Sequence, residues 1–277
     1  GAWMDACVGA DIDNTTAIAQ HWYQLYECDS TQVPGRGPQA ENLVAPSAKA
    51  AAKENLEIGL AKADAAGLPL WLEETGPTSC GGTNDTSLTN AMSLWAADFT
   101  LYAASLGVDR LAMHSMLGAC NGGAPMSLVC DPADHGTASA TLQGRPHFAA
   151  MRLLVPSIGG TFTKTGIDGG GNMSAYTVTK NDGKTLVTTV INANDAADIG
   201  GNPITLKIPD GFSVDRASQI YGPSNEAKNA TQVVPANPLP DSVPFSGPAP
   251  TASPADDNDL RIDLAASSAT VFIMSKG

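Results

Sequence analysis

The segment Leu68–Gly82 reads LPLWLEETGPTSCGG and indicates the fold more strongly than any other part of the chain. Its apolar beginning predicts a short buried strand over residues 68–72, and the pair Glu73 and Glu74 follows at the end of that strand. Residues 75–82 are polar and rich in glycine, as in a loop. In barrels of parallel strands, catalytic groups lie at the carboxyl ends of the strands. The two glutamates are therefore candidates for a catalytic site.

Helices and strands alternate on both sides of this segment. Proline at position 46 and glycine at position 67 bound an alanine-rich helix, and a second helix carries apolar residues in steps of three and four from Leu88 to Leu106, which predicts one buried face. Further strands are expected at 17–22 and 109–114, and a last helix at 145–154. The order β-α-β-α-β-α predicts a parallel sheet with crossover helices.

The hydrophobic period changes from about residue 159 onward. Residues 173–180 and 184–194 alternate between apolar and polar around Asn181-Asp182-Gly183, which is typical of a hairpin. Further strands are predicted at 204–208, 213–221, 259–264 and 268–275. The second half is therefore expected to be an antiparallel β-sandwich.

The two halves together predict a fold that is α/β in its first part and all-β in its second. A closed (β/α)8 TIM barrel takes about 250 residues and eight strand–helix units, and only three units fit before residue 155. We therefore expect residues 1–158 to be the last three units of such a barrel, without its N-terminal units, and residues 159–277 to be a β-sandwich accessory domain. An open three-stranded sheet would leave unpaired edges, which proteins avoid.

Charge and hydropathy exclude several classes of partner. The chain has 15 Lys and Arg against 28 Asp and Glu, a formal net charge of −13, so we expect binding neither to nucleic acid nor to an anionic membrane surface. No apolar run reaches the roughly 18 to 20 residues of a membrane span.

The five cysteines show no CxxC spacing, so a zinc site is not expected. Cys120 and Cys130 bracket a Gly/Pro-rich loop that a disulfide could close, and Cys80 is expected to be structural. Four Asn-x-Ser/Thr sequons, at Asn14, Asn84, Asn172 and Asn229, favour a secreted, extracellular protein.

Several motifs resemble the C-terminal half of family 79 glycoside hydrolases, which include β-glucuronidases and heparanase-like enzymes. The resemblance covers roughly residues 15–160. The motifs that carry it are His21-Trp22-Tyr23, Glu73-Glu74-Thr75-Gly76 with Ser79-Cys80-Gly81-Gly82, Leu94-Trp95-Ala96-Ala97-Asp98, and Gly107-Val108-Asp109-Arg110 with His114.

The resemblance implies a retaining mechanism with two carboxylates. We expect no cofactor, and no metal site is expected because no metal-ligand spacing links His135 and His147 to carboxylates. Glu74 matches the nucleophile. His21 and Tyr23 would lie beside it and bind it or the sugar, and His114 would line the floor of the sugar site. The family has Gly where this chain has Glu73, which makes Glu73 a rival nucleophile.

We expect the second carboxylate, the acid/base, to be missing from this chain. We therefore predict a retaining glycosidase acting on β-linked glycosides, with a glucuronide favoured by the resemblance alone. The N-terminal part of the barrel would come from the same or a separate chain, and this fragment alone would be inactive. Two alternatives are a truncated or degenerate homologue that binds carbohydrate without catalysis, and a β-xylosidase or glucosylceramidase-like enzyme of the same clan.

Overall fold

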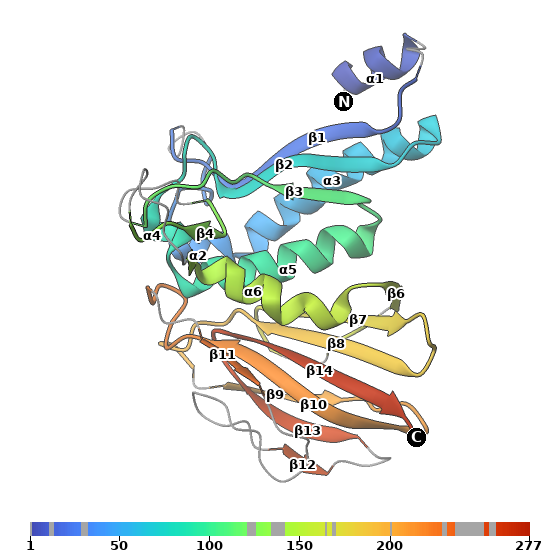
Figure 1. Ribbon diagram of the computed structural model, residues 1–277, viewed down its shortest axis with the longest axis vertical. Helices are drawn as coiled ribbons and strands as arrows, with labels where there is room; N and C mark the ends of the chain where they lie inside the picture. Colours follow the sequence, from blue (N-terminus) through green and yellow to red (C-terminus); the bar gives the residue numbers. More distant parts are fainter. Residues whose placement is uncertain are drawn as a thin grey trace. The chain divides into compact units, whose positions relative to one another are not determined.

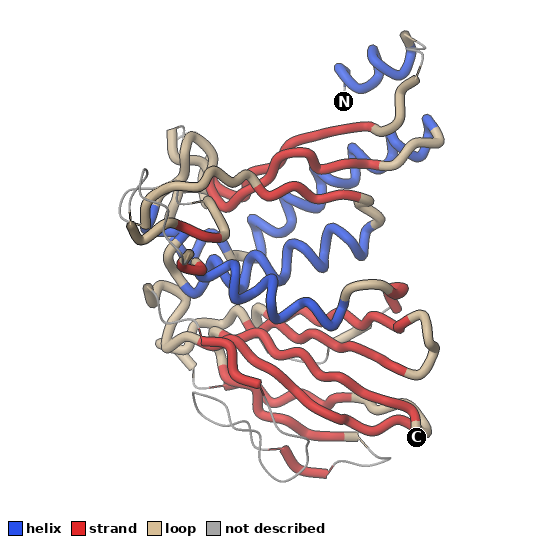
Figure 2. The backbone as a smooth tube through the Cα atoms, viewed as in Figure 1, coloured by secondary structure: helices blue, strands red, loops and turns tan. Residues whose placement is uncertain are grey.

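The computed structural model describes residues 2–10, 14–28, 33–120, 126–133, 142–163, 165–167, 170–199, 201–228, 232–235, 252–254 and 259–277. They form two compact units, one made of residues 1–87 and 99–143 and the other of residues 88–98 and 144–277. Figures 1 and 2 show the elements of each unit.

The first unit is an α/β structure around one parallel sheet. Its elements are α1 (Ala2–Gly9), β1 (Ile18–Leu25), α2 (Ala40–Leu43), α3 (Pro46–Ala66), β2 (Leu70–Thr78), α4 (Asn84–Ser87), β3 (Arg110–Met113) and β4 (Val129–Cys130). The sheet order is β1-β2-β3, and both pairs are parallel. Among the described residues this sheet has three strands and does not close into a barrel, and β1 and β3 each have one neighbouring strand.

Helix α3 follows from its sequence and packs closely on the sheet (Figure 1). Pro46 starts the helix, and Gly67, with φ of 64°, ends it by donating its N–H to the carbonyls of Ala63 and Asp64. The buried side consists of small residues and one leucine: Ala48, Ala52, Leu56, Gly59 and Ala63. At Gly59 a Cβ atom would lie 2.1 Å from the side-chain oxygen of Gln20 on β1, so glycine is what allows this close approach.

Strand β2 differs from the prediction, because it begins at Leu70 and continues through the acidic pair to Thr78. The sequence Thr75-Gly-Pro-Thr78 has the composition of a loop, yet it pairs with β1 up to Leu25 opposite Thr78. The pairing of β2 with β3 ends at Thr75. Proline has no N–H to donate, and at position 77 no hydrogen bond to β3 is lost.

The first half of helix α5 (Asn90–Leu106) also differs from the prediction of one buried face. Every residue from Ala91 to Ala97 is at most 3% exposed. In this stretch Met92, Leu94 and Trp95 are large, and the other four residues are alanine or serine. This part of the helix is therefore buried on all sides, whereas Ala104 and Ser105 near its end are exposed.

The second unit contains two antiparallel sheets (Figure 2). The first has the order β11-β10-β14-β8-β7-β6 and the second the order β12-β13-β9. Their bounds are β6 (Gly160–Thr163), β7 (Met173–Lys180), β8 (Thr185–Asn192), β9 (Gly201–Leu206), β10 (Phe212–Tyr221), β11 (Gln232–Pro235), β12 (Ala252–Pro254), β13 (Leu260–Ala265) and β14 (Ser268–Lys276). Helix α6 (Pro146–Leu154), followed by a short 3-10 turn η1 (Val155–Ser157), packs on β10, and β5 (Gln143–Gly144) precedes it.

One buried cluster joins the two sheets. Phe272, Val190 and Ala217 come from the six-stranded sheet, and Ile204, Leu206, Ile262 and Leu264 come from the three-stranded sheet. The predicted hairpin is present: β7 pairs with β8, and Gly183 between them has φ of 64°. Two antiparallel sheets that share a core confirm the expected all-β second part. The sandwich arrangement of these sheets stays a prediction.

Two disulfides lie in the first unit. Cys120 and Cys130 are bonded, as the sequence suggested. Cys28 and Cys80 are also bonded, across 52 positions of sequence. Cys80 is thus structural, and the sequence alone does not indicate its partner. No helix in the described part of the chain is long and apolar enough to cross a membrane.

Phe272 is expected to be a main contributor to the stability of the second unit. Its side chain is 2% exposed and belongs to the buried cluster, and it is among the largest fully buried side chains. Phe272→Ala should lower the free energy of unfolding by about 3–5 kcal/mol, because it removes a large apolar side chain and leaves a cavity. Urea denaturation measures this change.

The matched control is Ile158→Ala, at a position that is 70% exposed. Its effect should stay within about 0.5 kcal/mol. Equal losses of stability in the two variants would contradict the assignment of Phe272 to the core.

Candidate active site

A β-bulge in β2 sets the direction of the acidic pair. Leu72 lies opposite Gln20 of β1, but the next pair is Glu74 opposite His21, so Glu73 is an extra residue. The same extra residue appears on the other side, where Leu72 and Thr75 lie opposite Leu111 and Met113 of β3. Bulges re-aim side chains and are common beside functional sites.

The bulge turns Glu74 away from the helix side of the sheet. Gln20 donates to Asn55 of α3, so its partner Leu72, which is fully buried, shares that side. His21 is one residue further along β1 and faces the opposite side, and so does its partner Glu74. Without the extra residue, Glu74 would face the same side as Leu72.

Tyr23, Glu74 and His114 form a continuous hydrogen-bonded chain. The Tyr23 hydroxyl lies 2.8 Å from Oε1 of Glu74 and 2.7 Å from Nδ1 of His114. The rings of Tyr23 and His114 meet edge to face, with centroids 6.4 Å apart. Three side chains that lie far apart in the sequence are thus brought together on the sheet formed by β1, β2 and β3.

His21 lies beside this chain without a hydrogen bond to it. Its Nδ1 is 3.9 Å from Oε1 of Glu74, and its side chain is 60% exposed against 39% for Glu74. At that distance the two groups interact as charges when the imidazole is protonated. The structure therefore places all four predicted site residues in one cluster, with Tyr23 and not His21 in direct contact with the glutamate.

Glu73 belongs to a different group of side chains. Its Oε1 lies 3.6 Å from a guanidinium nitrogen of Arg110, and Arg110 stacks on the ring of Trp71 at 4.3 Å. Trp71 in turn donates to Asp109. The ion pair leaves Glu73 engaged by a cation, while Glu74 accepts from a neutral phenol.

Gly76 makes room for the Tyr23 ring. Tyr23 lies opposite Gly76 on the neighbouring strand, and a Cβ atom at position 76 would lie 2.9 Å from Cε1 of Tyr23 and 3.3 Å from the sulfur of Met126. Strands in a sheet are about 4.8 Å apart, so the phenol must cross β2 to reach His114 at the end of β3. A bare backbone at position 76 permits this crossing.

Arg36 holds the end of β1 behind Tyr23. Its guanidinium donates to the backbone carbonyls of Tyr23 and Gln24 and stacks on the rings of Trp22 and Tyr26. Burial lowers the pKa of Arg36, and the adjacent Tyr26 opposes that shift. Nothing in its Pro/Gly-rich sequence context signals this role, and sequence reasoning missed both Arg36 and the spacing function of Gly76.

The environment of Tyr23 favours its protonated form. Burial raises the pKa of its hydroxyl, and the hydrogen bond to Glu74 and the charge of Glu74 raise it further. Tyr23 is therefore a hydrogen-bond donor to the carboxylate over the physiological range, and this bond leaves Oε2 of Glu74 without a contact to Tyr23.

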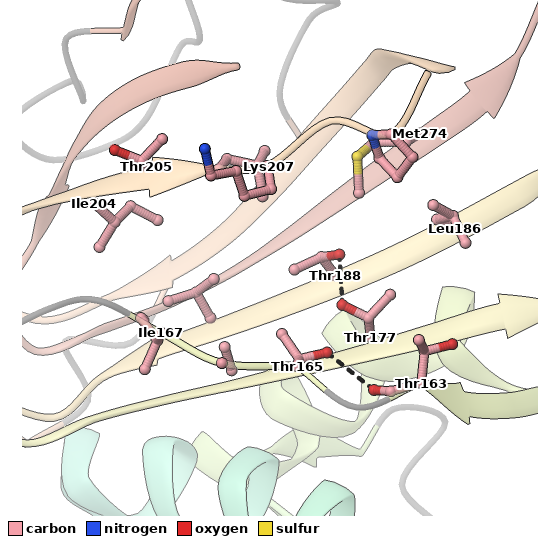
Figure 3. Close-up of a pocket in the computed structure, with 15 residues that line it drawn as sticks. Thr163, Thr165, Ile167, Thr177, Leu186, Thr188, Ile204, Thr205, Lys207 and Met274 are labelled. Atoms are coloured by element: carbon pink, nitrogen blue, oxygen red, sulfur yellow. Dashed lines mark hydrogen bonds between the residues drawn. The ribbon is translucent and has the colours of Figure 1, made fainter. Parts of the chain in front are cut away.

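The second unit contains a cavity whose lining differs from the acidic and aromatic candidate site (Figure 3). It has a volume of about 290 Å³ and is lined by aliphatic side chains and threonines. Thr177 and Thr188 bond to each other, and Lys207 pairs with Asp259. No aromatic ring is among the lining residues that the structure describes, so the cavity lacks a surface for stacking a sugar. We assign it no carbohydrate-binding role.

Among the residues described, no three His, Cys, Asp or Glu side chains come together as a metal site.

No protein-family model matches the sequence, and no curated protein is similar to it. Similar folds occur among solved structures. The GH51 arabinofuranosidase from Xanthomonas axonopodis pv. citri has a TM-score of 0.66 and 12% identity, over 99% of this chain and 56% of its own. A 4-O-α-L-rhamnosyl-β-D-glucuronidase from Fusarium oxysporum 12S has a TM-score of 0.63 and 15% identity, over 98% of this chain and 62% of its own.

A glycoside hydrolase family 44 endoglucanase is also similar, with a TM-score of 0.60 and 12% identity, over 99% of this chain and 51% of its own. The chain thus spans between half and two thirds of the length of these three structures. At these identities the likeness shows the fold: this chain has the fold of part of a glycoside hydrolase.

The raised pKa of Tyr23 predicts a pH dependence of stability. The folded protein holds the phenol proton more tightly than the unfolded chain, whose tyrosines titrate near pH 10. The stabilisation is therefore complete below about pH 10 and is lost as the pH rises above it. The difference in free energy of unfolding between wild type and Tyr23→Phe should shrink as the pH rises from about 10 to 11, as measured by urea denaturation.

A difference that stays constant over this range would contradict the hydrogen bond to Glu74. The same series on the Glu74→Gln background is the matched control. Removing the charge should leave a smaller dependence on pH, from burial alone.

Proposed function

We propose that this chain is the C-terminal part of a retaining glycoside hydrolase and that Glu74 is its nucleophile. The observation that supports this proposal most directly is the Tyr23–Glu74 hydrogen bond of 2.8 Å, on a parallel strand of a glycoside hydrolase fold. A nucleophilic carboxylate must remain ionised, and a phenol donor favours the ionised form.

The proposed reaction uses the second oxygen of Glu74. Tyr23 occupies Oε1, so Oε2 attacks the anomeric carbon, and a bond forms between them as the bond to the leaving oxygen breaks. An acid/base carboxylate about 5–5.5 Å away protonates that oxygen and then removes a proton from the attacking water. Protonated His21, at 3.9 Å, would stabilise the negative charge on Glu74 before the attack.

The acid/base carboxylate would come from strands that pair with the sheet edges. Strands β1 and β3 each have one neighbour among the described residues, and the similar structures are longer than this chain. We propose that the N-terminal barrel units, in the same or a separate chain, add to these edges. The isolated 277-residue chain would then be inactive.

The substrate is proposed to be a β-linked glycoside. The resemblance of the motifs to family 79 favours a glucuronide, and one of the similar structures is named as a β-D-glucuronidase. The β-xylosidase and glucosylceramidase-like enzymes of the same clan remain alternatives. The two disulfides fit the expectation of a secreted protein, since disulfides persist in oxidising compartments.

The decisive experiment compares Glu74→Gln with Glu73→Gln in the protein that carries all eight strand–helix units. Glu74→Gln should lower kcat roughly 10⁴-fold, because it replaces the attacking carboxylate with an amide. Glu73→Gln, which disrupts the ion pair with Arg110, should cost far less. Turnover of aryl β-glycosides and circular dichroism of the folded variants provide the measurements.

A Glu74→Gly variant, which removes the whole side chain, tests whether Glu74 acts as a nucleophile or has only a structural role. Added azide should restore turnover by attacking in place of the carboxylate, giving a glycosyl azide of opposite anomeric configuration. Near wild-type activity of Glu74→Gln would exclude Glu74 as nucleophile, and a larger loss in Glu73→Gln would exchange the two roles. If all forms lack activity, the non-catalytic alternative is favoured.

A further inference from the structure

The protons in the Tyr23–Glu74–His114 chain can be assigned by counting donors. A tyrosine hydroxyl has one proton to donate, and an ionised carboxylate only accepts. The hydroxyl of Tyr23 contacts Oε1 of Glu74 and Nδ1 of His114 at 2.8 and 2.7 Å, and both distances are those of hydrogen bonds. Two hydrogen bonds need two protons.

Only one arrangement satisfies both bonds when Glu74 is ionised and His114 is neutral. Tyr23 donates its proton to Glu74, so its oxygen must accept a proton from Nδ1 of His114. The reverse direction, with Tyr23 donating to His114, needs a protonated glutamate to donate to Tyr23. That form carries one proton more than the first, and it lacks the ionised Glu74 that the proposed nucleophile requires.

We propose that neutral His114 carries its proton on Nδ1 and presents Nε2 as a hydrogen-bond acceptor, which selects a hydroxyl group of the ligand. The side chain of His114 is exposed, and Nε2 has no hydrogen-bond partner in the part of the chain that the structure describes. A bare lone pair binds a donor such as a sugar hydroxyl and repels a carboxylate.

This selection deepens the proposed function and rests on it. The sugar position facing His114 carries a hydroxyl and not the carboxylate of a uronate. If the substrate is a glucuronide, its carboxylate must bind elsewhere. His114 is thus a residue that determines specificity, while Tyr23 is the positioning residue that fixes its tautomer.

The tautomer can be measured in the 277-residue chain without any activity. Long-range ¹H–¹⁵N spectra of protein labelled with ¹⁵N-histidine distinguish a ring protonated on Nδ1 from one protonated on Nε2. In mildly alkaline solution His114 should show the Nδ1–H pattern. The Nε2–H pattern in the wild-type protein would overturn the proposal.

Two variants test whether Tyr23 and Glu74 fix the tautomer of His114, a third assigns the His114 resonance, and a fourth is the control. Tyr23→Phe removes the acceptor, so His114 should shift toward the Nε2–H form that free histidine favours. Glu74→Gln should also release the tautomer, because the amide can donate to Tyr23. His114→Gln identifies the resonance, and His21→Gln is the matched control that should leave it unchanged. A tautomer that does not respond to Tyr23→Phe would overturn the proposed cause.

The ligand class is tested in the protein that carries all eight units, with methyl β-D-glucopyranoside and methyl β-D-glucopyranosiduronate. The two probes differ in a hydroxymethyl and a carboxylate group. A shift of the His114 Nε2 resonance with the glucoside, or with both probes through a shared ring hydroxyl, supports the proposal. A shift with the glucuronide alone, or with neither probe, overturns its ligand part.

Failure of this inference and failure of the proposed function are distinguishable. An Nε2–H tautomer with a 10⁴-fold loss in Glu74→Gln would refute the inference and leave the nucleophile in place. An Nδ1–H tautomer in a protein whose Glu74→Gln variant keeps full turnover would refute the nucleophile and leave the tautomer in place.

Discussion

The candidate site depends on the one extra residue that β2 carries between Leu72 and Glu74. Side chains alternate along a strand, so Leu72 and Glu74 would ordinarily face the same side of the sheet. The bulge at Glu73 reverses this relation on both sides of β2. It lets Leu72 fill the layer against α3 while Glu74 meets Tyr23 on the opposite side.

The remaining features of the site follow from that register. Beyond the bulge, Gly76 lies opposite Tyr23, and the amide of His114 donates to Thr75 of β2. A side chain at position 76 would separate the phenol from the imidazole. The backbone geometry therefore determines which side chains can meet. Tyr23 is long enough to cross β2, Gly76 leaves room for its ring, and His114 at the end of β3 contacts its hydroxyl group.

The sequence predicts much of the first unit because its signals are local. Pro46 and Gly67 bound α3 as expected, since each fixes a backbone angle by itself. The predicted length of β2 is too short because Gly76 and Pro77 have the composition of a loop. Only the pairing with β1 holds these residues in an extended strand. Arg36 and the partner of Cys80 could not be identified, because their contacts join segments whose sequences carry no common pattern. The four site residues were grouped by resemblance, whereas the hydrogen bonds that order them, and the bulge that turns Glu74, required the structure.

The Cys28–Cys80 disulfide has a consequence for proteolysis. It joins the segments that follow β1 and β2, so the helix α3 and the whole of β2 lie inside a covalent ring. A single cut by a protease anywhere between the two cysteines would open the ring without releasing a fragment. The nicked chain would stay in one piece, heavier by a single water, until the bond is reduced, and His21 would remain tethered to Glu74 through sulfur as well as through the strands.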